Sequence, residues 1–312
     1  MSRAAKASAR DRPSRIEMSL DTSRLSALSR LFSSAVLHEM AAEGKSGLFA
    51  SLVRESGLAI HASSIDRVRD LFDVAFGALK ARGARDEYIY RAALAQRLFL
   101  GKHSLRTACM LTEFRAGDSK ADVVILNGTS SVYEIKSERD SLSRLDRQIE
   151  NYKSVFASVF VIAGENHVAA VVKATSTDVG VLALSRRYQI TTVREALDLP
   201  SRVSPSMVFQ SIRTSEASEV LEYLGQKVSA GPNTTRREEL RKRFEALSPE
   251  SAHKGLLHVL KRSRNMMPLR DLVLRLPHSL HAAALSVPVR KGSHERLLGA
   301  IETPLVDALE WA

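Results

Sequence analysis

Three ionisable residues in one short segment have the types and spacing needed for phosphodiester chemistry. In the segment SKADVVILNGTSSVYEIKSERD, Asp122 precedes Glu134, and Lys136 lies two residues beyond Glu134. Side chains alternate between the two faces of a β-strand, so Glu134 and Lys136 share one face. Burying two such groups is costly unless something compensates their charge. On spacing alone, the alternation of Glu and Lys is also typical of a solvated edge strand, and that alternative stays open here.

The chemistry that this trio could perform is hydrolysis of nucleic acid. Two carboxylates can bind a hard divalent cation, Mg²⁺ or in its place Mn²⁺, which keeps several of its waters. The bound cation would lower the pKa of one water and neutralise charge on the scissile phosphate. A lysine beside it would orient the water or stabilise the transition state. We therefore predict Asp122, Glu134 and Lys136 as catalytic residues, with both carboxylates as metal ligands.

Hydrophobic periodicity predicts the elements that must position these residues. Asn127–Gly128 indicates a hairpin turn that would bring Asp122 alongside the strand of Glu134 and Lys136. The predicted order is a helix over 86–100 ending at Gly101, strands over 108–114, 121–126 and 131–136, a helix over 139–155, and a strand over 158–163. This order defines an α/β fold. Further strands are expected over 169–172, 179–184 and 191–197.

Order and motif together resemble the PD-(D/E)XK nuclease superfamily. Its restriction-endonuclease-like core is a helix, a three-stranded meander, a helix and a further strand, with the mixed sheet flanked by helices. Its motif places an acidic residue on the second strand and (Asp/Glu)-x-Lys on the third, as Asp122, Glu134 and Lys136 do. The proline that names the motif is replaced by Ala121, as in many divergent members. The resemblance covers residues 87–163 and implies a Mg²⁺-dependent deoxyribonuclease.

The resemblance also implies a third metal ligand. The first helix of the family often supplies a glutamate, and Glu87 in DEYIYRAAL is the matching residue. An exposed acid in the first helical turn, favoured by the helix dipole, is the alternative explanation for Glu87. Glu113, on the first predicted strand, is a rival for the same role.

The predicted helix over 139–155 carries three polar residues spaced four apart: Arg144, Gln148 and Tyr152. Such spacing places side chains on one helical face. Exonuclease-like branches of the superfamily carry Gln-x-x-x-Tyr here, which implies that these residues contact DNA. A tyrosine packed between helix and sheet is the alternative for Tyr152. The segment EIKSERDSLSRLDRQIENY also resembles a group of bacterial proteins that have no assigned substrate. Members of this group are loosely linked with mobile elements or phage defence.

Outside the core the chain is expected to be helical. We predict a disordered basic tail over 1–20, a helical region over 21–84, the nuclease core over 85–200, and a helical region over 201–312. Within the last, helices are expected over 205–223, 235–247, 250–264, 269–276 and 295–300. The basic tail faintly resembles an organelle transit peptide, although disorder fits its composition better. If a partner controls the protein, both helical regions would form protein interfaces.

Composition favours a soluble, cytoplasmic protein that meets a polyanion. The net charge is +11, 44% of residues are hydrophobic, and no apolar run is long enough to span a membrane. A positive surface attracts phosphates because binding releases condensed counterions. Cys109, the single cysteine, excludes an internal disulfide framework. We expect DNA as the partner, no membrane, and a homodimer or a regulatory protein as further partners, since many enzymes of this fold cut as dimers.

Basic residues near the carboxyl end of the helix over 250–264 form a second candidate surface. Lys261, Arg262 and Arg264, with Arg270 and Arg275 beyond, could contact a DNA backbone. Cations are also favoured at helix carboxyl termini without any ligand, and this alternative stays open. The nine histidines show no ligand arrangement, and no phosphate-binding glycine loop is present.

Overall fold

A six-stranded mixed sheet lies at the centre of the protein in a computed structural model, which describes residues 21–81, 85–138, 140–227 and 233–312. The strands follow chain order across the sheet. They are β1 (Cys109–Ala116), β2 (Ser119–Leu126), β3 (Ser130–Lys136), β4 (Ser158–Gly164), β5 (Gly180–Leu184) and β6 (Ile190–Arg194). β1, β2 and β3 form an antiparallel meander, β3, β4 and β5 run parallel, and β6 returns antiparallel.

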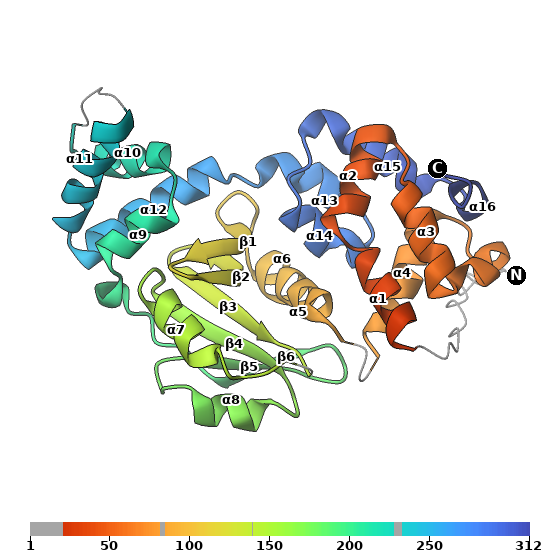
Figure 1. The fold of residues 1–312 in the computed structure, drawn as a ribbon, viewed down its shortest axis with the longest axis horizontal. Helices are drawn as coiled ribbons and strands as arrows, with labels where there is room; N and C mark the ends of the chain where they lie inside the picture. The colour runs from red at the N-terminus through yellow and green to blue at the C-terminus, as the bar shows by residue number, and fades with distance from the viewer. Residues whose placement is uncertain (1–20, 82–84, 139, 228–232) are drawn as a thin grey trace, which may run out of the picture.

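Parallel neighbours need crossover connections, and two helices supply them. α7 (Leu145–Lys153) connects β3 to β4, and α8 (Val168–Ala174) connects β4 to β5. The predicted strand over 169–172 is therefore wrong, because this segment forms the α8 crossover. A long helix packs against β3 (Figure 1) and consists of α5 (Glu87–Ala93), a π-helical turn η2 (Leu94–Phe99) and α6 (Leu100–Lys102).

The remaining helices form two lobes, one at each end of the view in Figure 1. The terminal lobe combines both ends of the described chain, because α2 and α4 pack against α15. Its helices are α1 (Thr22–Arg30), α2 (Ser34–Glu43), α3 (Gly47–Ser56), α4 (Val68–Leu79), α13 (Arg270–Arg275), α14 (His281–Ser286), α15 (His294–Glu302) and α16 (Leu305–Ala308), with short 3-10 turns η1 (Leu58–Ser64), η4 (Met267–Leu269), η5 (His278–Leu280) and η6 (Lys291–Ser293).

The second lobe, here the α9–α12 lobe, follows the sheet through the 3-10 turn η3 (Pro200–Arg202). Its helices are α9 (Pro205–Ser211), α10 (Thr214–Tyr223), α11 (Asn233–Glu245) and α12 (Pro249–Ser263), and α9 also packs against β1. Buried hydrophobic side chains form one core that runs through the sheet and both lobes. Within the described ranges no helix is long and apolar enough to cross a membrane.

Local chemistry explains where element boundaries differ from those expected. The helix predicted to start at residue 139 begins only at Leu145, because the preceding polar residues bond to the backbone instead: Asp140 accepts from the Ser137 N–H at 2.7 Å. The helix predicted over 205–223 is two helices, broken before Thr214. Gly101 lies inside α6 rather than ending the helix. The predicted basic tail over 1–20 lies outside the described residues.

Candidate active site

The predicted trio converges where β2 and β3 separate. The ladder between these strands includes Val123 opposite Tyr133, and the next residues in that register would be Asp122 and Glu134, which do not pair. The Asp122 carboxylate instead accepts the backbone N–H of Ile135 at 2.6 Å. The hairpin connection has three residues, since Leu126 pairs with Ser130. The carboxylates of Asp122 and Glu134 therefore lie side by side at the open end of the hairpin.

Glu134 and Lys136 are buried, with 2% and 7% of their surfaces exposed, and α7 supplies their partners. The Lys136 Nζ donates to Glu134 Oε1 at 2.9 Å and to Gln148 Oε1 at 2.9 Å. The Tyr152 hydroxyl donates to Glu134 Oε2 at 2.6 Å and lies 3.0 Å from the Lys120 carbonyl oxygen. The alternative of a solvated edge strand is thereby excluded, because Glu134 and Lys136 are enclosed.

Within the trio, the pKa of the Asp122 carboxyl group is raised, because nearby positive charge does not offset its burial and the charge of Glu134. Burial, and next the adjacent Glu134 carboxylate, raise the pKa of Asp122 to about 8, while the Ile135 N–H and Lys136 act in the opposite direction. Like charges that share a buried site cannot both ionise readily. Burial and the charge of Glu134 also raise the pKa of Tyr152 well above its ordinary value, so its hydroxyl keeps its proton and remains a donor.

Glu87 and Glu113, the two candidates for the third carboxylate, each form an ion pair with a neighbouring basic residue. The charge of Glu87 contributes to the raised pKa of Asp122, which places Glu87 within Coulombic reach of the site. Glu87, at the start of α5, forms an ion pair with Arg91 one turn later. Glu113 falls opposite Asp122 in the register of β1 and β2, with a left-handed φ of 55°, and its carboxylate pairs with Lys120 at 2.7 Å.

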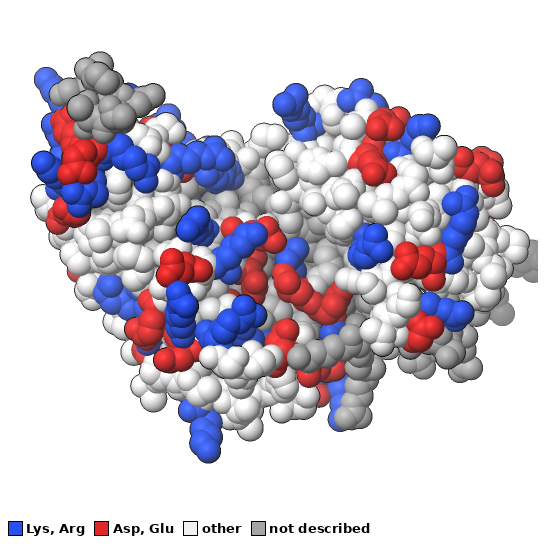
Figure 2. Space-filling view, in the orientation of Figure 1, with Lys and Arg blue, Asp and Glu red and all other residues white. Residues whose placement is uncertain are grey.

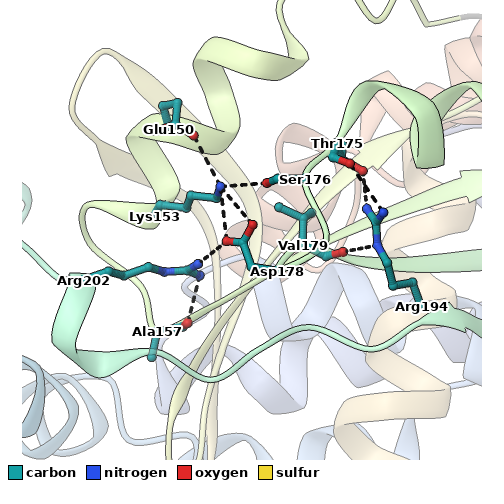
Figure 3. A network of polar contacts seen from close by, with 9 residues as sticks. All are labelled: Glu150, Lys153, Ala157, Thr175, Ser176, Asp178, Val179, Arg194 and Arg202. Atoms are coloured by element: carbon teal, nitrogen blue, oxygen red, sulfur yellow. Dashed lines mark hydrogen bonds and ion pairs between the residues drawn. The ribbon is translucent and has the colours of Figure 1, made fainter.

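The helix that carries Gln148 and Tyr152 is fixed at its carboxyl end by a polar network (Figure 3). Asp178 lies between two cations and accepts from Lys153 of α7 and from Arg202 of η3, with Nζ–Oδ2 and Nη1–Oδ2 distances of 3.1 and 2.6 Å. Burial opposes the charge of Asp178, but hydrogen bonds from Ser176 and Lys153 hold its pKa below the ordinary value. This network holds Gln148 and Tyr152 over β3.

Arg144 does not join the buried cluster. It precedes the first residue of α7, in the helix N-cap position, and its side chain is exposed. Of the three residues predicted on one helical face, only Gln148 and Tyr152 contact the trio. Arg91, which sequence reasoning overlooked, pairs with Glu87, and its Nε is buried without a hydrogen-bond partner. The four-residue spacing of Glu87 and Arg91 on a helix is the signal that could have identified it.

The carboxylate oxygens of Asp122 and Glu134 are the kind of ligand that a hard cation prefers. Magnesium commonly binds to one or two carboxylates and keeps its remaining waters. Two neighbouring carboxylates, one of them with a raised pKa, form a pair that a cation would stabilise. In the parts of the chain with described positions, however, no three His, Cys, Asp or Glu side chains are grouped closely enough to hold a metal together. The Asp122–Glu134 pair could therefore supply two ligands to a divalent cation, but it does not form a complete coordination shell.

The described residues thus define a mixed α/β protein with a buried Asp–Glu–Lys cluster on adjacent strands. The family model of bacteriophage P4 protein cII matches residues 80–274, more than half of the chain, and the chain belongs to this family. Protein cII of Enterobacteria phage P4 is 43% identical over 63 residues, which make up 20% of this chain and 24% of that protein. The match therefore spans about a quarter of the length of this relative.

A solved structure is also similar in part. It is a protein of unknown function from Silicibacter pomeroyi, with a TM-score of 0.29 and 18% sequence identity. The alignment covers 58% of this chain and 88% of the other.

Proposed function

We propose that this protein is a metal-dependent nuclease of the PD-(D/E)XK type that hydrolyses phosphodiester bonds of DNA. The observation that carries the proposal is the buried cluster of Asp122, Glu134 and Lys136, placed on adjacent strands and bonded to α7. The order helix, three antiparallel strands, helix, parallel strand over residues 87–164 supports a restriction-endonuclease-like core. The net charge of +11 suits a polyanionic substrate.

In this proposal Asp122 and Glu134 bind Mg²⁺ or Mn²⁺. The bound cation would supply an acidified water and charge neutralisation at the phosphate. Lys136 holds its ammonium between the Glu134 carboxylate and the Gln148 amide oxygen, where it can orient that water or stabilise the developing negative charge. Tyr152 orients the Glu134 carboxylate by donating to its second oxygen. Each group thus has one role that its contacts support.

Glu87 is the better third carboxylate for this metal. Both carboxylates pair with a cation, Glu87 with Arg91 and Glu113 with Lys120, but it is Glu87 whose charge contributes to the raised pKa of Asp122. Arg144, exposed just before α7, would contact the phosphate backbone outside the cluster. We expect Glu87→Gln to weaken Mg²⁺ affinity several-fold and Glu113→Gln to leave it nearly unchanged, as measured by calorimetric titration. The reverse order would assign the ligand role to Glu113.

The nuclease activity is tested with linear, circular and single-stranded DNA and with RNA, each with Mg²⁺, with Mn²⁺ and with chelator. We expect cleavage of DNA that requires the metal and falls at least about 100-fold in Glu134→Gln. Because removal of Lys136 alone would leave the Glu134 charge buried and unpaired, the double variant Glu134→Gln/Lys136→Gln serves as the folded comparison.

The matched control is Asp146→Asn, which removes an exposed carboxylate from the same helix, α7. It should cleave as the unmodified protein does. Equal cleavage by Glu134→Gln and the control would refute the proposal. Metal-independent DNA binding without cleavage under every condition would favour instead a catalytically silent nucleic-acid-binding protein on the same fold, or an effector that a partner must activate.

A further inference from the structure

A basic groove lies between the β2–β3 hairpin connection and α12, away from the buried cluster. Its volume is about 580 Å³. Four cationic side chains line it, Arg106, Lys254, Lys261 and Arg262, and no acidic residue does; the other lining residues are Asn127, Gly128, Tyr223, Leu257, His258, Asn265 and Met267. Asn127 follows Asp122 by five residues on an extended strand, so the groove begins about 17 Å from the cluster.

The four cations of this groove are not neutralised by the protein itself. Among the described residues, the side chains of Arg106, Lys254, Lys261 and Arg262 take part in no ion pair, although other basic residues nearby do. Arg264 pairs with the buried Glu216 at 2.6 Å. Like charges held together without counterions repel one another, so the site would be stabilised by an anion.

The structure therefore divides the basic surface expected from the sequence. Arg264 and Arg275 form ion pairs within the protein, the latter with Glu295 at 2.5 Å. Lys261 and Arg262 line the groove, where Lys254 joins them from two turns earlier in α12 and Arg106 from the loop before β1. Figure 2 shows basic side chains along both rims of the hollow between the lobes, with acidic and basic groups mixed on its floor.

An aromatic pair in the wall of the groove indicates which polyanion fits. The rings of Tyr223 and His258 are stacked, with centroids 3.8 Å apart and planes 9° from parallel. Tyr223 is 41% exposed, and the Lys254 ammonium lies 6.0 Å from its ring centroid. Exposed aromatic faces beside cations are the arrangement on which nucleic-acid bases stack while their phosphates are neutralised. An inorganic polyanion such as polyphosphate would make no use of the rings.

We infer that this groove is a second nucleic-acid-binding surface, which holds the phosphates of a strand with Arg106, Lys254, Lys261 and Arg262 and stacks a base at Tyr223. The inference deepens the proposed nuclease function by naming an anchoring site for its substrate. It rests on that function only for the identity of the substrate. The binding itself requires neither the metal nor the buried cluster.

The test is a fluorescence-anisotropy titration of labelled 20-nucleotide DNA, single-stranded and duplex, in chelator and at several NaCl concentrations. We expect the variant Lys254→Gln/Lys261→Gln/Arg262→Gln to bind at least tenfold more weakly at 100 mM NaCl. The slope of log affinity against log salt should fall by about 2–3, because each lost phosphate contact removes about 0.9. Arg106→Gln, on a different element, should add to the loss.

Two further variants keep the test specific. Lys45→Gln/Lys173→Gln/Arg187→Gln makes the same charge change at exposed residues outside the groove and should bind within about twofold of the unmodified protein. Tyr223→Ala should weaken single-strand binding roughly fivefold or more, with little effect on the salt slope. Circular dichroism would confirm that each variant is folded.

The outcomes separate this inference from the nuclease proposal. The titration in chelator measures binding without the proposed metal-dependent cleavage, so the two readouts are independent. If nothing is cleaved but the groove variants still weaken binding, the inference stands and the nuclease function fails. The inference is overturned if the unmodified protein does not bind DNA, if the triple groove variant binds equally well, or if the control triple loses as much affinity.

Discussion

At the residue scale, two opposing effects act on the ionisation of Asp122. Its carboxylate accepts the Ile135 N–H, which favours the ionised form, yet burial and the neighbouring Glu134 raise its pKa to about 8. Without a cation, the native protein therefore holds a proton on Asp122 that the unfolded chain, with a pKa of about 3.9, has released. The unfolded state binds fewer protons between these values, so stability falls as pH rises from about 4 to about 8.

This linkage predicts the behaviour of Asp122→Asn. The amide oxygen can still accept from Ile135 but carries no charge, so the variant should lose the pH-dependent penalty. We expect its Tm to exceed that of the unmodified protein by at least about 2 °C at pH 8.5 in chelator, with the difference shrinking towards pH 4. Thermal unfolding followed by circular dichroism at several pH values measures this. A difference that does not change with pH would contradict the assigned pKa.

Tyr152 makes a second prediction possible at this scale. Its hydroxyl donates to the Glu134 carboxylate, so Tyr152→Phe should lower the free energy of unfolding by about 1.5–3 kcal/mol, the contribution of a hydrogen bond to a charged group. The control is Tyr90→Phe, because the Tyr90 hydroxyl is buried without a hydrogen-bond partner. Its loss should be neutral or stabilising in urea unfolding. Equal destabilisation by both changes would rule out the assigned role of Tyr152.

At the element scale, the packing of α12 against α10 depends on one glycine. A Cβ built at Gly255 would lie 2.5 Å from Val220 Cγ1, whereas one at Gly299 in α15 would meet nothing within 4 Å. Both glycines are helical. Gly255→Ala should therefore destabilise the protein by about 1–3 kcal/mol through overpacking, and Gly299→Ala should stabilise it by about 0.5–1 kcal/mol. Chemical unfolding of the two variants measures the contrast, and the same sign for both would contradict this packing.

The elements also show what the sequence could predict. Short strand-like runs and the Asn–Gly turn placed the first three strands within two residues of their observed ends. Strand alternation and the turn indicated that the trio could converge, whereas the roles of Gln148 and Tyr152 beside it were implied by the resemblance to the nuclease superfamily. The start of α7 could not be foreseen, because Ser and Asp side chains between β3 and α7 compete with helical hydrogen bonding.

Other features depend on tertiary structure and leave little trace in local patterns. The segment over 169–172 has the β-branched residues of a strand, but it must cross from β4 to parallel β5 and does so as a helix. Whether a basic residue is free or neutralised also depends on distant partners: Arg264 meets Glu216, whereas Arg262, two residues earlier, meets no carboxylate in the described parts of the chain. The groove could not be predicted for that reason.

At the scale of the whole molecule, the chain-order division into helical regions 21–84 and 201–312 differs from the spatial arrangement. α15 packs against α2 and α4, and the Val68 N–H donates to the Thr303 carbonyl at 3.1 Å. The ion pairs of Glu302 with Arg67 and Arg69 link the same segments. Residues from both ends of the described chain thus share one lobe, and the described residues between 205 and 263 form another.

Hydrogen exchange can test this arrangement. Leu297→Ala, at a fully buried position of α15, should cost about 2–5 kcal/mol and accelerate amide exchange in α1–α4 as well as in α13–α16. Leu240→Ala, equally buried in α11, should accelerate exchange in α9–α12 instead. If the effect of Leu297→Ala stayed within the carboxyl-terminal helices, the two ends of the chain would not form one cooperative unit.

The separation of β2 from β3 at Asp122 has a spectroscopic consequence. The Ile135 amide, which points at the Asp122 carboxylate rather than at a strand carbonyl, senses the charge of that carboxylate through its hydrogen bond. Its proton resonance therefore reports the ionisation of Asp122 directly. A single backbone signal can follow the occupancy of the carboxylate pair, even in variants that no longer turn over substrate.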